Sequence, residues 1–340
     1  MKRKSFFISL IALFAFGLTF TSCNKEEQNN NGIYSPDKKI ASIERSIPSI
    51  SFKGSRDDNR FQNWFWKDGV LDRIEDVEGF IGYKFIYDDN NVLQEVLINT
   101  DTNYFDDDNM VARYNYNDGV INKISVFKLD FDDNEEELEY EILFKSEAGK
   151  IVTITYIEHD DYSKNDNATN GDISRYFNEV TSPIISVLMP NEVSELFTRN
   201  IQKQIENNSR KGDIEFRLEL FYDENNNNLT KALFYDEDDV EAEVILKFLE
   251  YDNKANPYFG YLNPNDDNDL LALNLGGLSK NNVLKIEIAE TNDGDKEYYE
   301  RTIEYNGDFP SKIVTKYFEI EENGELDDLE IESIYWFTYL

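Results

Sequence analysis

Cysteine and histidine are almost missing from this chain of 340 residues, which contains one of each. A single cysteine cannot form an intramolecular disulfide, so packing alone must hold the fold together in an oxidising compartment. Zinc sites usually take several cysteine and histidine ligands, and this sequence offers only Cys23 and His159. A serine hydrolase triad would have to use His159, yet no Gly-x-Ser-x-Gly elbow is present. We therefore assign no catalytic residue and no zinc site.

Basic residues are also scarce, with 34 Lys and Arg side chains against 69 Asp and Glu side chains. The net charge of −35 repels nucleic acids and anionic lipids, so no nucleic-acid partner is expected. Disordered acidic segments have few aromatic side chains, whereas 14% of this chain is aromatic and 40% is hydrophobic. The composition therefore predicts a folded and strongly acidic protein.

Long uncharged apolar runs are missing except at the start of the chain, in residues 5–22. Basic residues 2–4 precede this run and small residues lead to Cys23, an order typical of a bacterial lipoprotein signal peptide. The alternative is a spanning helix, but such a helix needs about 20 apolar residues, and Ser, Thr and Gly dilute this run. We expect residues 1–22 to be removed, which changes the net charge from −35 to −38. Lipidation of Cys23 would then hold the chain on a membrane through acyl chains.

The residues after Cys23 suggest a location. Residues 24–28 (Asn-Lys-Glu-Glu-Gln) resemble the export signal that some gram-negative bacteria use to send lipoproteins to the outer leaflet of the outer membrane. An outer-membrane, surface-exposed lipoprotein is our prediction, and the inner leaflet stays as the alternative. The polar composition of residues 23–41 predicts a flexible tether before a folded domain in residues 42–340.

Period-2 alternation of apolar and polar residues predicts β-strands through the folded part. Residues 214–222 and 242–248 alternate in this way. Pairs such as Asp68-Gly69, Asp118-Gly119 and Asn306-Gly307 suit tight hairpin turns. We predict an all-β fold: an antiparallel meander of repeated hairpins that forms a large twisted sheet or an open sandwich. The apolar residues 335–340 predict a covered strand that closes the fold.

The hairpins form a repeat in which an aromatic residue ends one strand, an Asp/Asn/Gly turn follows, and an aliphatic pair opens the next strand. Examples are residues 65–71, 87–93 and 116–121. Residues 87–90 and 222–226 resemble the YD-type (Rhs-like) repeats of uncharacterised bacterial surface lipoproteins. Residues 251–258 and 279–283 also resemble recurrent segments of those lipoproteins. The resemblance implies that the first ends a strand and the second enters the next one after a short turn or helix.

Two regions interrupt the β-pattern. Residues 191–197 and 267–275 are predicted to form one or two short helices. Residues 160–172 are rich in Asn, Asp, Ser and Gly, which predicts a long exposed loop and a possible seam between two lobes near residues 160–190.

Calcium is the metal that so many carboxylates could bind, because it prefers oxygen ligands. A weak match to a calcium-binding loop contains Glu319, Glu321, Asn323 and Glu330. The same residues are explained more simply by a hairpin with a turn at Asn323-Gly324. Calcium therefore stays a minor possibility, and no other cofactor is expected.

Binding is the function class that the sequence favours over catalysis. Trp64 and Trp66 lie two apart on a predicted strand, so their rings face the same way, either as an exposed platform for a glycan or protein ligand or as part of the core. A glycoside hydrolase needs only two suitably spaced carboxylates, and this sequence singles out no pair. We therefore predict a lipid-anchored surface protein with a non-catalytic β-sheet binding or structural module; a carbohydrate-active enzyme is the alternative.

Overall fold

The computed structural model describes eleven parts of the chain, which consist mostly of strands. These parts are residues 30–46, 60–76, 81–100, 109–129, 136–159, 214–224, 227–236, 241–262, 275–291, 296–319 and 330–340. The strands are β1 (Ile40–Ser46), β2 (Arg60–Lys67), β3 (Val70–Asp76), β4 (Ile81–Tyr87), β5 (Leu93–Thr100), β6 (Asn109–Asn117), β7 (Val120–Leu129), β8 (Glu136–Glu147), β9 (Lys150–Glu158), β10 (Ile214–Tyr222), β11 (Leu229–Asp236), β12 (Val244–Ala255), β13 (Asn281–Glu290), β14 (Lys296–Asn306), β15 (Phe309–Glu319) and β16 (Glu330–Tyr339).

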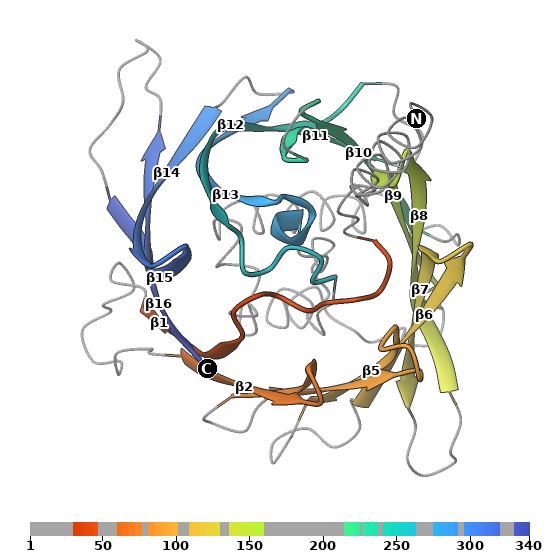
Figure 1. The fold of residues 1–340 in the computed structure, drawn as a ribbon. Coiled ribbons are helices and arrows are strands. Elements are labelled where there is room, and N and C mark those ends of the chain that lie inside the picture. The colour runs from red at the N-terminus through yellow and green to blue at the C-terminus, as the bar shows by residue number, and fades with distance from the viewer. Residues whose placement is uncertain are drawn as a thin grey trace, which may run out of the picture.

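The strands form one closed antiparallel barrel (Figure 1). Each strand pairs with its neighbours in the sequence, and β1 pairs with both β2 and β16, where Ile43 lies opposite Gln62 and Phe337. The predicted all-β antiparallel meander is confirmed, but the predicted open twisted sheet or sandwich is wrong. Closure pairs the backbone N–H and C=O groups of the first and last strands, which an open sheet would leave exposed at its edges.

Successive connections in a meander alternate between the two ends of the barrel, so each end has its own set of connections. The connections after β2, β4, β6, β8, β10 and β14 all lie at one end, which we call the tight-turn end. Asp68-Gly69, Asp118-Gly119 and Ala148-Gly149 close three of these hairpins with two residues each, all at positive φ. This geometry matches the right-handed twist of paired strands, so the Asp-Gly signals at residues 68 and 118 are confirmed as hairpin turns.

The repeat seen in the sequence corresponds to a repeated distortion of the barrel wall. In six hairpins of the tight-turn end, the pairing register skips one residue shortly after the second strand begins. Such bulges bend a strand and increase its twist, which helps a sheet to curve into a barrel. The skipped residues are Asp72, Gln94, Asn122, Val152, Thr230 and Ser311.

The interior of the barrel is mostly apolar and is filled by further segments of the chain. We call the filling segments the plug: residues 30–39, residues 256–262, and the 3-10 helix η3 (Leu275–Leu278). Figure 1 shows the N-terminal segment, in red, and η3, in blue, inside the ring of strands. Tyr258 and Tyr261 of the plug pack against wall residues Trp64 and Phe337, with ring centroids 5.4–6.2 Å apart. Wall and plug therefore share one hydrophobic core.

The outer wall is charged. Side chains that alternate with the buried ones pair across neighbouring strands, as in Lys123–Glu141 at 2.6 Å and Lys285–Glu300 at 2.8 Å. Arg113 bridges Glu95 and Glu136 in the same way, at 3.1 and 2.6 Å. The strands are thus mostly apolar toward the plug, with a few buried polar side chains such as Arg301, and polar toward the outside.

Several expectations fall on other parts of the chain. The predicted helix at residues 191–197 and the loop and seam near residues 160–190 lie outside the described residues, as do residues 267–274 of the second predicted helix.

The predicted tether is shorter than its composition suggests. Residues 30–41, which composition assigns to the tether, belong to the barrel, and Asn30 and Ile40 are fully buried. Among the described residues, no helix has both the length and the apolar character that a membrane crossing requires.

Candidate functional site at the tight-turn end

Aromatic side chains join successive hairpins at the tight-turn end. The hydroxyl of Tyr116, at the end of β6, donates to the carbonyl of Leu93, which opens the strand before it, at 2.7 Å. The same relation recurs around the barrel: Tyr222 to Ile151, Tyr251 to Leu229, Tyr339 to Pro310, and the indole Nε1 of Trp66 to Ile40, at 2.7–2.8 Å. Each bond ties the aromatic residue of one repeat to the aliphatic residue of its neighbour, which explains the repeat chemically.

The N-terminal part of the plug is fixed to the same hairpins by its backbone. The carbonyls of Asn30 and Gly32 accept hydrogen bonds from the backbone N–H groups of Ile121 and Leu93, at 2.8 and 2.9 Å. The buried hydroxyl of Tyr34 donates to the carbonyl of Pro257, at 2.7 Å. These bonds satisfy polar backbone groups that would otherwise be costly to bury, so a polar segment can fill the core.

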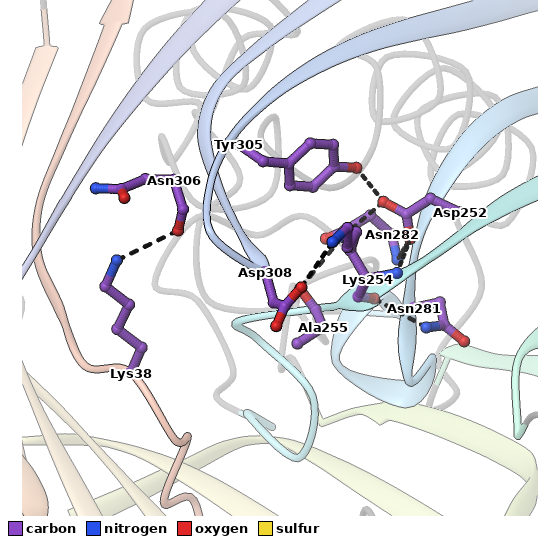
Figure 2. Close-up of polar contacts among 9 residues, drawn as sticks. All are labelled: Lys38, Asp252, Lys254, Ala255, Asn281, Asn282, Tyr305, Asn306 and Asp308. Carbon is purple, nitrogen blue, oxygen red and sulfur yellow. Dashed lines mark hydrogen bonds and ion pairs between the residues drawn. The ribbon is translucent and has the colours of Figure 1, made fainter.

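A carboxylate organises the base of the second plug segment, at the junction of β12 and β13. The Oδ1 atom of Asp252 accepts hydrogen bonds from the backbone N–H groups of Lys254 and Asn282, at 3.0 and 3.1 Å. Its Oδ2 atom accepts from the Nδ2 atom of Asn282, at 3.0 Å, and from the hydroxyl of Tyr305. Figure 2 shows Asn282 of β13 and Tyr305 of β14 pointing toward Asp252 of β12. We call this set the Asp252 cluster.

Further polar contacts extend the Asp252 cluster in both directions. Lys254 forms an ion pair with Asp308 of the β14–β15 turn, at 2.6 Å (Figure 2). On the other side, Asn281 donates its backbone N–H to the Oδ1 of Asn228 and accepts a bond from the Nδ2 of Asn228, at 3.0 and 3.1 Å. Asn228 and Asn282 are buried, so these amides hold the β10–β11 turn against the excursion between β12 and β13.

The electrostatics of the cluster suit a structural role. Burial raises the pKa of the Tyr305 hydroxyl well above its ordinary value, and the hydrogen bond to Asp252 raises this pKa further. Burial also raises the pKa of Tyr251. Both hydroxyls therefore stay protonated at neutral pH and act as hydrogen-bond donors. The pKa of Asp308 is lowered by its hydrogen bond from Lys254.

Two small voids lie between plug and wall. One is bounded by residues that include Tyr251, Asn282 and Arg301, and the other by Tyr34, Tyr87 and Tyr116 among others. Each has a volume of about 20 Å³. A void of that size has room for about one water molecule. These voids lie within the core and do not form an open binding cleft.

The structure places the two tryptophans that the sequence singled out on the inner face of the wall and the single histidine on its outer face. Trp64 is only 3% exposed and packs against the plug, whereas Trp66 is half-buried and lies near Tyr34, with ring centroids 5.7 Å apart. Both rings face the interior. The Nε2 atom of His159 lies 3.4 Å from a carboxylate oxygen of Glu141, on the outer side of the wall.

The weak calcium loop is only partly described. Glu319 ends β15 and Glu330 begins β16, whereas Glu321 and Asn323 fall outside the described residues, as does Cys23. Within the described ranges, no group of three or more His, Cys, Asp or Glu side chains could hold a metal ion.

Sequence reasoning missed the plug and the role of Asp252, although a signal for the latter was present. Residues 251–258 and 279–283 stood out as recurrent segments that end one strand and enter the next. The structure confirms this: β12 ends at Ala255, η3 follows, and β13 begins at Asn281. Their polar residues meet in the Asp252 cluster, a contact that spacing along the chain cannot reveal.

No family model and no curated protein matches the chain, so the resemblance to lipoproteins with YD-type repeats is not confirmed. Among solved structures, a porin-like protein from Bacteroides vulgatus aligns with 89% of this chain and 99% of its own, at 9% identity and a TM-score of 0.46. A DUF3836 family protein from the same species aligns with 32% of this chain and 87% of its own, at 18% identity and a TM-score of 0.15. The TcdB2-TccC3 structure aligns with 86% of this chain and 18% of its own, at 8% identity and a TM-score of 0.18. At these TM-scores the likenesses carry no conclusion about function.

Proposed function

We propose that this chain is a lipid-anchored protein of the outer membrane, displayed at the cell surface, and that its barrel works without catalysis, as a binding or structural module. The observation that carries the proposal is the polarity of the barrel, which is the reverse of that of a membrane-spanning barrel. Its described wall is mostly apolar toward the plug and charged toward the outside.

The charged outer wall argues that the barrel itself does not sit in lipid. A Lys or Arg side chain on the lipid face of a membrane barrel costs about 2–4 kcal/mol near the bilayer centre. Here Lys123, Lys285 and Arg113 face outward from three different strands, each with carboxylate partners. Such a wall is suited to water. Attachment to a membrane would then depend on the lipid that we expect on Cys23.

The filled interior argues against a role as a channel. Tyr258, which is 1% exposed, lies inside the barrel and packs against Trp64 of β2 and Phe337 of β16, the two strands that flank β1. Barrels of 16 to 18 strands that serve as porins leave an aqueous channel, and the plug occupies that space here. Contacts with a ligand or partner would therefore be made by the outer surface and the ends of the barrel.

Mass spectrometry of the mature N-terminus tests the anchor. We expect a chain that begins at Cys23 and carries acyl groups, and we expect Cys23→Ser to move the protein from the membrane fraction to the soluble fraction. An unacylated start, or a leader that is still attached, would contradict the proposal.

Two measurements on intact cells and purified protein test the remaining parts. Protease added to intact cells should cleave the protein if it is displayed at the surface, whereas complete protection would place it on the inner leaflet. A glycan array probed with the soluble Cys23→Ser chain tests sugar binding. No signal across all glycans would count against a glycan as the ligand.

A further inference from the structure

We propose that the tight-turn end of the barrel faces the membrane and lies against the lipid headgroups, so that the opposite end points away from the bilayer. This orientation rests on the proposed lipidation of Cys23. It follows from three observations: where the described chain enters the barrel, how few residues separate that point from Cys23, and where exposed apolar side chains gather.

The chain enters the barrel at the tight-turn end. Asn30 is fully buried, and its backbone carbonyl accepts from the N–H of Ile121, the second residue of β7 after the turn at Asp118-Gly119. Its Nδ2 atom donates to the hydroxyl of Ser146, just before the next tight turn, at 3.0 Å. Asn30 is therefore fixed between two hairpins of this end.

The distance from Asn30 to the proposed anchor is limited by covalent geometry. Seven residue steps separate Cys23 from Asn30. A fully extended chain spans at most about 3.5 Å per residue, so the lipidated cysteine lies within about 25 Å of Asn30.

This reach is too short for the opposite orientation. Eight residue steps separate Val120 from Lys128 along β7, which at about 3.3 Å per residue is about 26 Å along the strand and, at the usual strand tilt of about 40°, about 20 Å of wall height. Crossing the rim from the interior to the outer face adds about 10 Å, the usual thickness of a sheet with its side chains. To bring the opposite end to the membrane, the chain before Asn30 would have to leave the mouth of the barrel, cross its rim and run down the whole outer wall. Seven residues cannot cover that path.

Exposed apolar side chains gather at the same end. Of the five large hydrophobic side chains that are exposed in the described part of the chain, four lie there. Ile86 and Phe221 are next to the last residues of β4 and β10, Ile33 is in the plug near the mouth, and Leu340 follows β16. Apolar side chains at a membrane surface gain free energy from shallow burial among headgroups.

The charges at this end limit how deeply it can insert. Lys38, Lys39 and Lys150 lie over the rings of Tyr339, Trp66 and Tyr222, at 4.7–5.3 Å from the ring centroids. Lysine and aromatic side chains together suit the interfacial zone, where the amines can meet lipid phosphates. Acidic turn residues, Asp68 and Asp118 among them, oppose deeper burial. We therefore expect contact with zwitterionic headgroups and no insertion into the hydrocarbon.

Headgroup quenching of two matched fluorophores tests the orientation. Asn117→Cys places a thiol at the tight-turn end, and Glu137→Cys places one near the opposite end. Both positions are exposed, and they flank the same strand, β7, opposite Val120 and Lys128. The full-length lipidated variants, labelled with bimane, would be reconstituted in phosphatidylcholine vesicles that carry a nitroxide on the headgroup. We expect at least threefold stronger quenching at position 117 than at position 137.

The outcomes separate the orientation from the anchor. Equal quenching, or stronger quenching at position 137, in protein that floats with the vesicles would overturn the orientation and leave the anchor intact. The parent protein is the control for the anchor, since an acylated Cys23 cannot react with bimane. A parent protein that is labelled, or that fails to float, would overturn the lipidation and the orientation with it.

A longer tether provides a second test of the distance argument. Inserting 20 Gly and Ser residues between Gln28 and Asn29 should leave flotation unchanged but reduce the quenching at position 117 at least twofold, because the barrel can then leave the surface. Unchanged quenching after the insertion would show that tether length does not set the orientation, and would contradict the proposal.

Discussion

The hairpins β6–β7 and β12–β13 both pair antiparallel strands in the wall, but they connect these strands in different ways. The first turns back through Asp118-Gly119 alone, whereas the second leaves the wall at Asn256 and returns at Lys280. The described part of this excursion includes Tyr258 and η3, which fill the interior. A barrel of this size is too wide for wall side chains to fill, so a repeated hairpin builds the wall and an inserted segment must supply the core.

The largest expected effect comes from removing the main anchor of the excursion. We expect Tyr258→Ala to lower the free energy of unfolding by about 3–5 kcal/mol, the usual cost of truncating a buried aromatic side chain. Urea denaturation followed by tryptophan fluorescence would measure it. Asn115→Ala, an exposed position on β6, is the control and should change stability by less than about 0.5 kcal/mol. A change of similar size in both variants would mean that the plug adds little to stability.

Two glycines distinguish close packing in the excursion from free space in a turn. A Cβ atom on Gly277 of η3 would lie 2.4 Å from the carbonyl oxygen of Tyr261, whereas one on Gly119 would meet no atom within 4 Å. We expect Gly277→Ala to cost about 3 kcal/mol, because the clash is with backbone atoms that must shift. Gly119→Ala should cost only about 1–2 kcal/mol, for the positive φ of 77°. Thermal unfolding of the two variants would rank them, and a larger loss for Gly119→Ala would refute the close packing of η3.

The hydrogen bonds of Tyr116 and Tyr251 should contribute similar stability to the β6–β7 and β12–β13 hairpins, because both bonds belong to the repeat. Tyr116→Phe and Tyr251→Phe each remove one hydroxyl donor to a backbone carbonyl, of Leu93 and of Leu229. Each should cost about 1 kcal/mol in chemical denaturation. Tyr251 also contacts the hydroxyl of Ser279, at 3.1 Å, so its variant should lose slightly more. If only one of the two variants lost stability, the idea of an equivalent bond in each repeat would be wrong.

The smallest effect concerns the ion pair between the excursion and the neighbouring turn. The pKa of Asp308 is lowered by Lys254, so the stabilisation is present above the ordinary carboxyl pKa and is lost as the pH falls through the lowered value. The pair is exposed, so only a slight change in stability is expected. NMR titration of Asp308 should show its pKa rise toward the ordinary value in Lys254→Met. An unchanged pKa would mean that Lys254 does not contact Asp308 in solution.

Prediction from sequence succeeded where the signal is local. The turns at Asp68-Gly69 and Asp118-Gly119 and the strand at residues 214–222 match the structure. The resemblance also placed a strand end within residues 251–258 and a strand start within residues 279–283, where β12 ends and β13 begins. Residues 335–340 were expected to close the fold, and β16 does so by pairing with β1. Prediction failed for residues 30–41, because their polar composition resembles a tether while their backbone groups bind the ends of distant hairpins.

The amino-acid sequence by itself determined the strands, their turns, their antiparallel order and the aromatic residue of each repeat, since each depends on neighbours a few positions apart. Tertiary structure alone decided that the sheet closes, that Trp64 and Trp66 face inward, and that Asp252, Asn282 and Tyr305 meet. Closure depends on twist and bulges summed over all sixteen strands. Once the barrel is closed, its wide interior must be filled, and the distant segments that fill it are thereby brought into contact.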